Sequence, residues 1–147
     1  MSAQDGNWFI EHFDSAGVAF GLRLKQKLEA VQTPYQHIEM WETDTFGYLM
    51  TIDGATMLSS RDNFLYHEMM AHPALFAHAA PRRVLIIGGG DCGTLREVLR
   101  HGGVEKAVQI DIDEQVTRFS EKYFPELCEA NDDPRAELRF EDGVKFM

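Results

Sequence analysis

The sequence predicts an α/β protein in which a small N-terminal antiparallel β-domain precedes the first half of a parallel sheet. Residues 1–62 contain short β-like segments with turn residues between them. Residues 63–147 begin with a helical pattern and then alternate buried-type strands with amphipathic helices. Such alternation is typical of a parallel sheet with right-handed crossovers. We therefore expect two domains with these bounds.

The N-terminal domain is expected to be a small antiparallel sheet. Apolar residues alternate at Ile38 and Met40, and a second apolar run over residues 48–52 ends at Asp53-Gly54. Asp-Gly between apolar runs indicates a hairpin, because both positions of the tight turn need a positive φ. A hairpin turn is therefore predicted at these two residues.

A helix is predicted to follow, with Asp62 as its N-cap and its start near Phe64. Pro73 should break or bend this helix, because proline lacks a backbone donor and clashes with the preceding turn. Helical spacing places five side chains on one side of it: Phe64, Leu65, Glu68, Met69 and His72.

The parallel sheet is predicted from residue 84 onward. The β-branched run at residues 84–87 lacks polar alternation, which is typical of a strand buried on both faces. A helix over residues 94–101 follows and ends at two glycines. The remaining elements continue the pattern, with strands at residues 107–110 and 136–140 and a helix at residues 114–124.

A glycine-rich loop connects the first parallel strand to its helix. Gly88, Gly90 and Gly93 match the Gly-x-Gly-x-x-Gly pattern, and Asp111 and Asp113 follow roughly 20 residues later. In a Rossmann-like unit the glycines let the backbone approach the ligand, and an acid after the second strand accepts hydrogen bonds from ribose hydroxyls. Asp111 is our first candidate for that acceptor. The pattern predicts a nucleoside site, with a tight turn that binds no ligand as the alternative.

The charge of the loop indicates which nucleoside it binds. Asp91 lies inside the loop, where its carboxylate would repel the pyrophosphate of a dinucleotide. A ligand that carries an ammonium or a sulfonium would be attracted instead. The loop therefore favours an S-adenosylmethionine-like ligand over NAD.

The helix before the loop carries a histidine pattern that resembles a zinc-protease motif. His67 and His72 are five residues apart, so they point about 140° away from each other on a helix and cannot share one metal. Tyr66 and His67 are, by their residue types, more often packing or interface residues than catalytic ones. No metal site is predicted.

Composition limits the partners and the compartment. With 14 basic and 24 acidic residues the net charge is −10, which disfavours nucleic acid and anionic membranes and suits a cationic substrate, although solubility alone would explain it equally well. We expect neither a signal peptide nor a membrane span, and we expect Cys92 and Cys128 to be reduced thiols. These features predict a cytoplasmic protein.

Several motifs in fixed order together resemble the spermidine synthase family. They are Asp53-Gly54, Arg61-Asp62, Tyr-His-Glu-Met-Met at residues 66–70, Ile-Gly-Gly-Gly-Asp at residues 87–91 and Leu-Arg-Glu-Val at residues 95–98. The resemblance implies a methyltransferase-type Rossmann-like domain behind the β-domain. It also implies transfer of an aminopropyl group from decarboxylated S-adenosylmethionine to putrescine, giving spermidine and methylthioadenosine. The nucleoside is then a co-substrate, and no tightly bound cofactor is expected.

The resemblance further implies roles for individual residues. The amine side would be formed by Asp91, which holds an ammonium, and by Tyr66, which lines the diamine channel. The nucleoside side would consist of the loop glycines Gly88 and Gly90, the ribose acceptor Asp111, and Asp142 with Gly143 at the adenine edge. Gln36 and His67 would contact either the nucleoside or the amine.

The sequence also departs from the family pattern. Asp111 stands where the family usually has glutamate, Cys92 replaces a glycine, Met57 a glutamine and Ser60 a glutamate. The family's proton-accepting aspartate, in an Asp-Ser-Ser-Asp-type segment, is expected beyond Met147. No catalytic residue is therefore assigned, and we expect a truncated chain that is inactive by itself.

The partners expected from these features are small polyamine and nucleoside molecules and other copies of the chain. Strand 84–88 would have an unpaired outer edge, which favours a homo-oligomer such as a dimer. Two alternative functions stay open. One is a methyltransferase-like enzyme that uses S-adenosylmethionine, and the other is a non-catalytic chain that binds a nucleoside.

Overall fold

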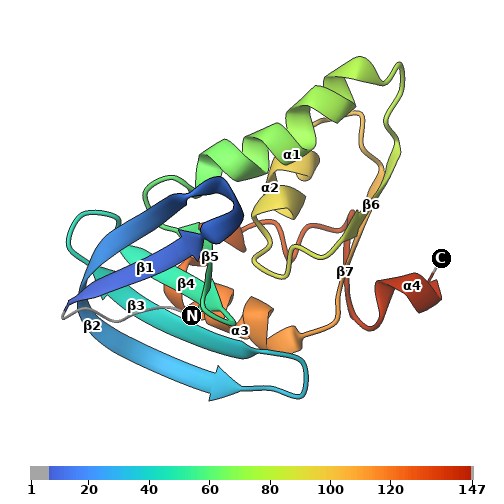
Figure 1. Cartoon of the computed structure of the whole chain (residues 1–147). Helices are drawn as coiled ribbons and strands as arrows, with labels where there is room; N and C mark the ends of the chain where they lie inside the picture. Colours follow the sequence, from blue (N-terminus) through green and yellow to red (C-terminus); the bar gives the residue numbers. More distant parts are fainter. Residues whose placement is uncertain (1–6, 147) are drawn as a thin grey trace. The chain divides into compact units, whose positions relative to one another are not determined.

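The computed structural model describes residues 7–146, and its contacts divide the chain into two compact units, residues 1–62 and 63–147 (Figure 1). The first unit is one antiparallel sheet in the order β1-β2-β3-β4-β5. A short 3-10 turn, η1 (Asp14–Ala16), connects its first two strands. The strands are β1 (Trp8–Phe13), β2 (Val18–Gln32), β3 (His37–Thr43), β4 (Tyr48–Ile52) and β5 (Ala55–Ser59).

The antiparallel sheet curls around an apolar cluster of its own. β2 is 15 residues long, which is longer than the short segments that the sequence predicts. Its register to β3 shifts at two points, Leu24/Gln26 and Lys27/Glu29, and such bulges bend a strand and increase its twist. The bent sheet covers a cluster formed by Phe9, Leu22, Leu24, Trp41 and Leu49.

The hairpin predicted at Asp53-Gly54 is confirmed. Asp53 has a φ of 50° and Gly54 a φ of 80°, the left-handed conformation that a two-residue turn requires. Asp53 also accepts a hydrogen bond from the His37 backbone N–H through its side chain at 2.8 Å. That bond ties the turn to the start of β3.

The second unit contains the predicted parallel sheet, in the order β6-β7-β8. Its strands are β6 (Arg83–Ile87), β7 (Lys106–Asp111) and β8 (Ala136–Phe140). The helical elements are α1 (Asn63–Ala77), α2 (Gly93–Leu99), α3 (Glu114–Tyr123), the 3-10 turn η2 (Pro125–Leu127) and α4 (Gly143–Phe146). The fold class predicted from the sequence is therefore confirmed.

β6 is not buried on both faces, contrary to the prediction. Val84 and Ile86 pack against the apolar cluster that α1 and α2 contribute, whereas Leu85 and Ile87 are 43% and 55% exposed. Side chains of a strand alternate between faces, and α1 and α2 cover only one of them. Within residues 7–146, β6 is also an edge strand of its sheet.

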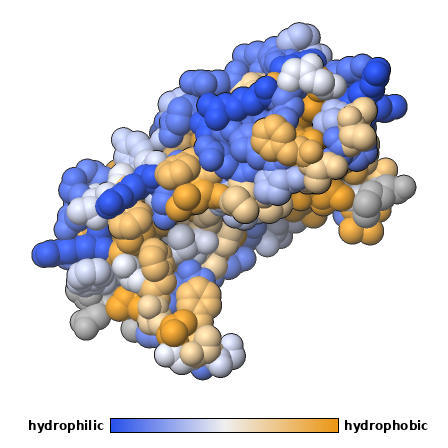
Figure 2. Space-filling model, turned by 90° about the horizontal axis from the view of Figure 1, so that it is seen from above, coloured by the Kyte–Doolittle hydropathy of each residue, from blue (hydrophilic) through white to orange (hydrophobic). Residues whose placement is uncertain are grey.

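The structure buries a different face of α1 from the side on which the sequence places five side chains. The buried residues are His67, Ala71 and Leu75, four residues apart on one face that packs with α2. On that side Phe64, Leu65 and Met69 are exposed, whereas Glu68 and His72 are partly buried. The view of Figure 2 shows hydrophobic surface on one face of the molecule. Exposed apolar residues of this helix include Phe64, Leu65, Tyr66, Met69, Met70 and Phe76.

Pro73 does not end α1, which continues to Ala77. Proline inside a helix removes the bond to the carbonyl four residues earlier. Ala71 and Leu75 lie on either side of this position and belong to the same buried cluster as α2. We attribute the continuity of the helix to this packing, because tertiary contacts override weak local preference.

Candidate ligand-binding site

The loop between β6 and α2 has a backbone that few residue types can adopt. Gly88, Gly89 and Cys92 have φ values of 81°, 83° and 69°. The Gly88 N–H donates to the Ile110 carbonyl at 2.8 Å, and the Cys92 N–H donates to the Gly89 carbonyl at 2.9 Å. Cys92 precedes α2 in a left-handed conformation that a side chain disfavours. Cys92, which stands where the family has a glycine, therefore strains the backbone just before α2.

The other two motif glycines are required by space. A Cβ at Gly90 would lie 2.9 Å from the Asp111 Oδ2 atom, and a Cβ at Gly93 would lie 2.2 Å from Cε1 of His67. The His67 ring therefore rests directly against the backbone where α2 begins. The motif thus combines one glycine with a positive φ, Gly88, and two that allow close approach.

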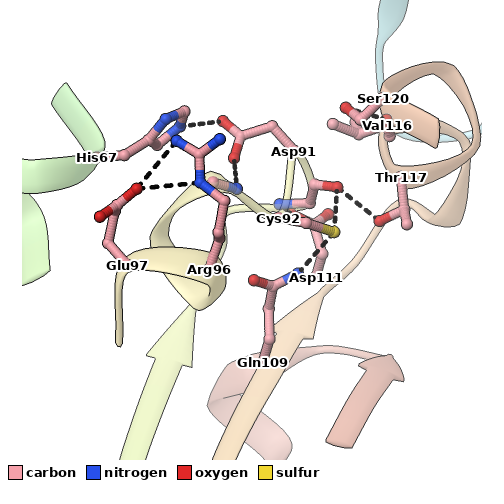
Figure 3. A network of polar contacts seen from close by, with 12 residues as sticks. His67, Asp91, Cys92, Arg96, Glu97, Gln109, Asp111, Val116, Thr117 and Ser120 are labelled. Atoms are coloured by element: carbon pink, nitrogen blue, oxygen red, sulfur yellow. Dashed lines mark hydrogen bonds and ion pairs between the residues drawn. The ribbon is translucent and has the colours of Figure 1, made fainter. Parts of the chain in front are cut away.

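Asp91 and His67 form the centre of the site (Figure 3). The Asp91 Oδ1 atom accepts from the Gly93 N–H at 2.8 Å, and its Oδ2 atom lies 3.1 Å from Nε2 of His67. The Asp91 side chain is 16% exposed and that of His67 is 1% exposed. Nδ1 of His67 is buried without a hydrogen-bond partner among the described residues. When Nε2–H donates to Asp91, Nδ1 is an acceptor with no donor.

Asp111 fixes the glycine loop to the end of β7. Its Oδ2 atom accepts from the Gly90 N–H at 2.8 Å, and its Oδ1 atom accepts from the Asp113 N–H at 2.9 Å. Burial raises the pKa of the Asp111 carboxyl above its ordinary value, and the two backbone donors oppose that shift. Each oxygen keeps a second lone pair for another donor.

Asp113 has a different role. It is buried, and its side chain caps α3 by accepting from the Gln115 N–H at 3.1 Å. The sequence offers two acids as ribose acceptors. Asp111 lies directly against the glycine loop, whereas Asp113 is the N-cap of α3.

Thr117 is a support for the loop that the sequence analysis missed. Its buried hydroxyl donates to the Gly90 carbonyl at 2.7 Å. Together with the Asp111 carboxylate, which binds the Gly90 N–H, it holds Gly90 through both of its backbone polar groups. A threonine inside a predicted helix gives no local signal of such a contact, because the contact joins residues 27 positions apart.

Glu97 is a second feature that the sequence does not reveal. It lies on α2 and is fully buried, yet it carries a carboxylate. Its oxygens lie 2.9 Å from Nη2 of Arg96, 2.8 Å from Nη1 of Arg100 and 3.3 Å from Nε2 of His72. His72 in turn bonds His101 at 2.9 Å. His67 and His72 thus belong to different polar networks.

Asp142 and Gly143 lie where α4 begins, after the end of β8. The Asp142 Oδ1 atom accepts from the Val144 N–H at 3.0 Å. A Cβ at Gly143 would lie 2.9 Å from the Ile87 side chain, so this turn contacts the end of β6. The predicted site residues of the second unit, other than the helix residues Tyr66 and His67, therefore follow the carboxyl ends of parallel strands, where open α/β sheets bind ligands.

Tyr66 lies on α1, outside this cluster of loop residues. The Tyr66 ring is exposed and meets the His67 ring edge-on, with 5.5 Å between centroids. Gln36 belongs to the first unit and closes the turn before β3, where its N–H donates to the Thr33 hydroxyl at 3.1 Å.

Comparison with known proteins agrees with this geometry. The fold and the glycine loop define a Rossmann-like α/β unit joined to a small β-unit. The family model described as "Spermine/spermidine synthase domain" matches residues 63–147, and the one described as "Spermidine synthase tetramerisation domain" matches residues 7–60. The chain belongs to the spermine/spermidine synthase family, as its motifs predict.

Individual relatives of the chain agree with this family assignment. A polyamine aminopropyltransferase from Xanthomonas campestris pv. campestris is 68% identical over the whole chain, and one from Xanthomonas axonopodis pv. citri is 67% identical. The crystal structure of spermidine synthase from Thermotoga maritima matches with a TM-score of 0.89 and 38% identity over 99% of the chain. A spermidine synthase in complex with the transition state analogue AdoDATO matches equally well. The chain spans 51% of the length of these two Xanthomonas relatives and of the Thermotoga structure.

Among residues 7–146, no helix is both long and apolar enough to cross a membrane.

Proposed function

We propose that this chain provides the nucleoside and amine site of a polyamine aminopropyltransferase. The reaction would transfer an aminopropyl group from decarboxylated S-adenosylmethionine to putrescine, giving spermidine and methylthioadenosine. The observation that carries the proposal is Asp91, a partly exposed carboxylate held inside the glycine loop by the Gly93 N–H and by His67. The family match supports aminopropyl transfer over the alternative methyltransferase activity.

The sign of the charge supports this choice of ligand. The side chain of Asp91 has no cation from Lys or Arg within salt-bridge distance among the described residues. A primary ammonium would supply that charge, and charge-assisted hydrogen bonds are the strong ones. Tyr66, edge-on to His67, would line the amine path.

The nucleoside would occupy the strand ends next to Asp91. Gly88 and Gly90 let the backbone approach it, and Asp111 has lone pairs left for the ribose hydroxyls. Asp142 and Gly143 would meet the adenine edge. This arrangement keeps the sulfonium side of the ligand near the loop carboxylate.

The chemical step requires little from these residues beyond orientation. A neutral amine attacks the methylene next to the sulfonium sulfur, the carbon–nitrogen bond forms and the carbon–sulfur bond breaks. The thioether then leaves without charge, and the amine loses a proton. Holding the two reactants in line is the main contribution to such a reaction. The proton acceptor is not among the residues that we assign.

The match of residues 7–60 to a tetramerisation domain supports a homo-oligomer of this chain. We further propose a cytoplasmic location, on the basis of its acidic composition and its two free thiols.

Asp91→Asn tests the proposal, because the change keeps the shape and removes the charge. We expect calorimetry to show loss of decarboxylated S-adenosylmethionine and putrescine binding. Neutral methylthioadenosine is the matched control and should still bind. Unchanged affinity for every ligand would contradict the assignment.

A second comparison separates the two enzyme classes. S-adenosylmethionine carries a carboxylate that Asp91 should reject, so the chain should bind the decarboxylated form more tightly. The opposite preference would favour a methyltransferase. Nucleoside binding by an intact assembly that shows no turnover would favour the non-catalytic alternative.

A further inference from the structure

Two buried hydroxyl groups on α3 are used in different ways. The Ser120 hydroxyl donates to the Val116 carbonyl at 2.9 Å, four residues earlier on the same helix. This is the local bond that serine and threonine commonly form inside a helix. The Thr117 hydroxyl instead donates to the Gly90 carbonyl at 2.7 Å, in the glycine loop (Figure 3). The Thr117 contact therefore serves the loop and not its own helix.

Gly90 is a position where the loop needs such a contact. Gly90 is buried and has no positive φ, unlike Gly88 and Gly89, so its backbone conformation does not require glycine. Space requires it, because a Cβ would lie 2.9 Å from Oδ2 of Asp111 and 3.1 Å from Cβ of Val116. Glycine loses more conformational freedom on folding than any other residue. Contacts from other segments therefore have to fix the backbone at this position.

Two distant side chains supply these contacts. The Asp111 Oδ2 atom accepts from the Gly90 N–H at 2.8 Å, and the Thr117 hydroxyl donates to the Gly90 carbonyl. The Cys92 thiol also faces this carbonyl, at 3.5 Å, but sulfur is a weak donor. Asp111 is in addition the proposed ribose acceptor, whereas Thr117 is completely buried. Thr117 therefore acts on a ligand only through the loop.

The bond from Thr117 bears directly on Asp91. The Gly90 carbonyl and the Asp91 N–H belong to one rigid peptide plane, so the hydroxyl fixes the direction in which the chain enters Asp91. The Asp91 carboxylate then makes two contacts, with the Gly93 N–H at 2.8 Å and with Nε2 of His67 at 3.1 Å. Both contacts need the carboxylate in one place, and rotation of the preceding peptide would weaken them.

We propose that Thr117 is a positioning residue for the Asp91 carboxylate, and thereby for the binding of a primary ammonium at the glycine loop. It acts through the peptide that joins Gly90 to Asp91 and does not touch the ligand. The effect on ammonium binding rests on the proposed function, whereas the effect on the loop does not. A threonine that only filled space in the core would instead stabilise α3 and the loop alike.

The effect on the loop is tested first, without a ligand. Thr117→Val keeps the shape of the side chain and removes the hydroxyl. We expect amide hydrogen exchange of the Gly93 N–H, which donates to Asp91, to become about tenfold faster, as for the loss of one net hydrogen bond. The Phe124 N–H donates to the Ser120 carbonyl on α3 at 2.8 Å and should keep its rate. An unchanged rate at Gly93, or equal acceleration at Phe124, would overturn the inference.

Three further variants complete this test. Thr117→Ser retains a hydroxyl and should keep the slow exchange of the Gly93 N–H. Thr117→Ala lacks it and should reproduce the faster exchange, so the result does not depend on the folding of the valine variant. Ser120→Ala is the matched control, because it removes a buried hydroxyl whose hydrogen bond stays within α3. Equally fast exchange at Gly93 in Ser120→Ala would contradict a specific role of Thr117.

The effect on binding is tested next by calorimetry. Decarboxylated S-adenosylmethionine carries the ammonium, and methylthioadenosine has the same nucleoside without it. We expect Thr117→Val to weaken binding of the first about tenfold and that of the second much less, and we expect Thr117→Ser to bind both like the parent. Equal losses for both ligands, or none, would overturn the inference. Absence of binding by the parent chain would instead contradict the proposed function, and amide exchange would still decide whether Thr117 positions Asp91.

Discussion

The two units of the chain bury different kinds of side chain. In the first unit the charged pairs lie near the surface, such as Lys25 with Glu42 at 3.0 Å, and the buried polar residues carry hydroxyl groups. The second unit buries ionisable groups, among them Glu97, His67 and Asp113. Burial of a charge is unfavourable unless it is paired and hydrogen-bonded. In the second unit these buried ionisable groups lie around the glycine loop and the helices that pack behind it. The proposed site lies in the same region.

The largest expected effect comes from Glu97→Ala. The change leaves the partly buried Arg96 and His72 without their shared carboxylate, so we expect a loss of about 3–5 kcal/mol in the free energy of unfolding. Urea denaturation should be followed by helical circular dichroism, since the helices among residues 7–146 that are longer than a 3-10 turn all lie in the second unit.

The matched control is Glu42→Ala, which removes the partner of Lys25 on the surface of the first unit. Both tryptophans of the chain, Trp8 and Trp41, lie in that unit, so their fluorescence reports on it. We expect no resolvable change for this variant. Equal destabilisation by the two variants would contradict the contrast between the units.

Gly93→Ala should have the next largest effect. The new methyl group would meet the His67 ring at 2.2 Å, and a buried ring cannot move away without displacing Asp91. We expect a destabilisation of up to about 3 kcal/mol and weaker binding of putrescine by calorimetry. Gly102→Ala is the control, because nothing lies within 4 Å of its added carbon. Similar losses of stability and of putrescine binding in Gly93→Ala and Gly102→Ala would contradict a tight contact between His67 and the loop.

Asp111→Ala should weaken methylthioadenosine binding by about 1–3 kcal/mol, the contribution of hydrogen bonds to a charged group. Calorimetry would measure this. Asp113→Ala should lower stability through the lost cap of α3 more than it lowers affinity. If Asp113→Ala weakened binding more than Asp111→Ala, we would assign the ribose acceptor to Asp113 instead.

The raised pKa of Asp111 also predicts a pH dependence. Burial raises this pKa in the folded chain, because it favours the protonated carboxyl. The stabilisation from protonated Asp111 is therefore fully present below the pKa of the unfolded chain, and it is lost as pH rises through the pKa of the folded chain. Ligand binding has the opposite trend, because the ribose needs the ionised acceptor. Methylthioadenosine affinity should fall on acidification through the raised pKa, and Asp111→Asn should remove that dependence.

The smallest expected effect is that of Gly17→Ala in the first unit. Gly17 has a φ of 65° and nothing lies within 4 Å of an added carbon, so only the backbone is strained. We expect the free energy of unfolding to fall by about 1–2 kcal/mol, as measured by tryptophan fluorescence. Gly17→Asn should recover part of it, since asparagine tolerates this conformation. A loss as large as that of Gly93→Ala would mean that backbone strain outweighs close packing in this chain.

Most of the proposed site follows from the sequence, because its residues belong to a compact motif. The glycine loop and Asp91 are adjacent in the chain, and Asp111 follows at the spacing set by one helix and one strand. The roles proposed for His67 and Tyr66 came only from the family resemblance. Thr117 and the buried state of Glu97 were missed, since neither residue type predicts burial.

The sequence by itself determined the order and type of the main strands and helices between residues 63 and 140, and the turn at Asp53-Gly54. These features depend on local periodicity and on the φ values that a residue can adopt, so residues that are neighbours in the sequence determine them. Only the tertiary structure decided which face of α1 is buried, that His67 rests on Gly93, and that Thr117 holds the Gly90 peptide. Each of these contacts joins segments far apart in the chain, and the packing of those segments settles them.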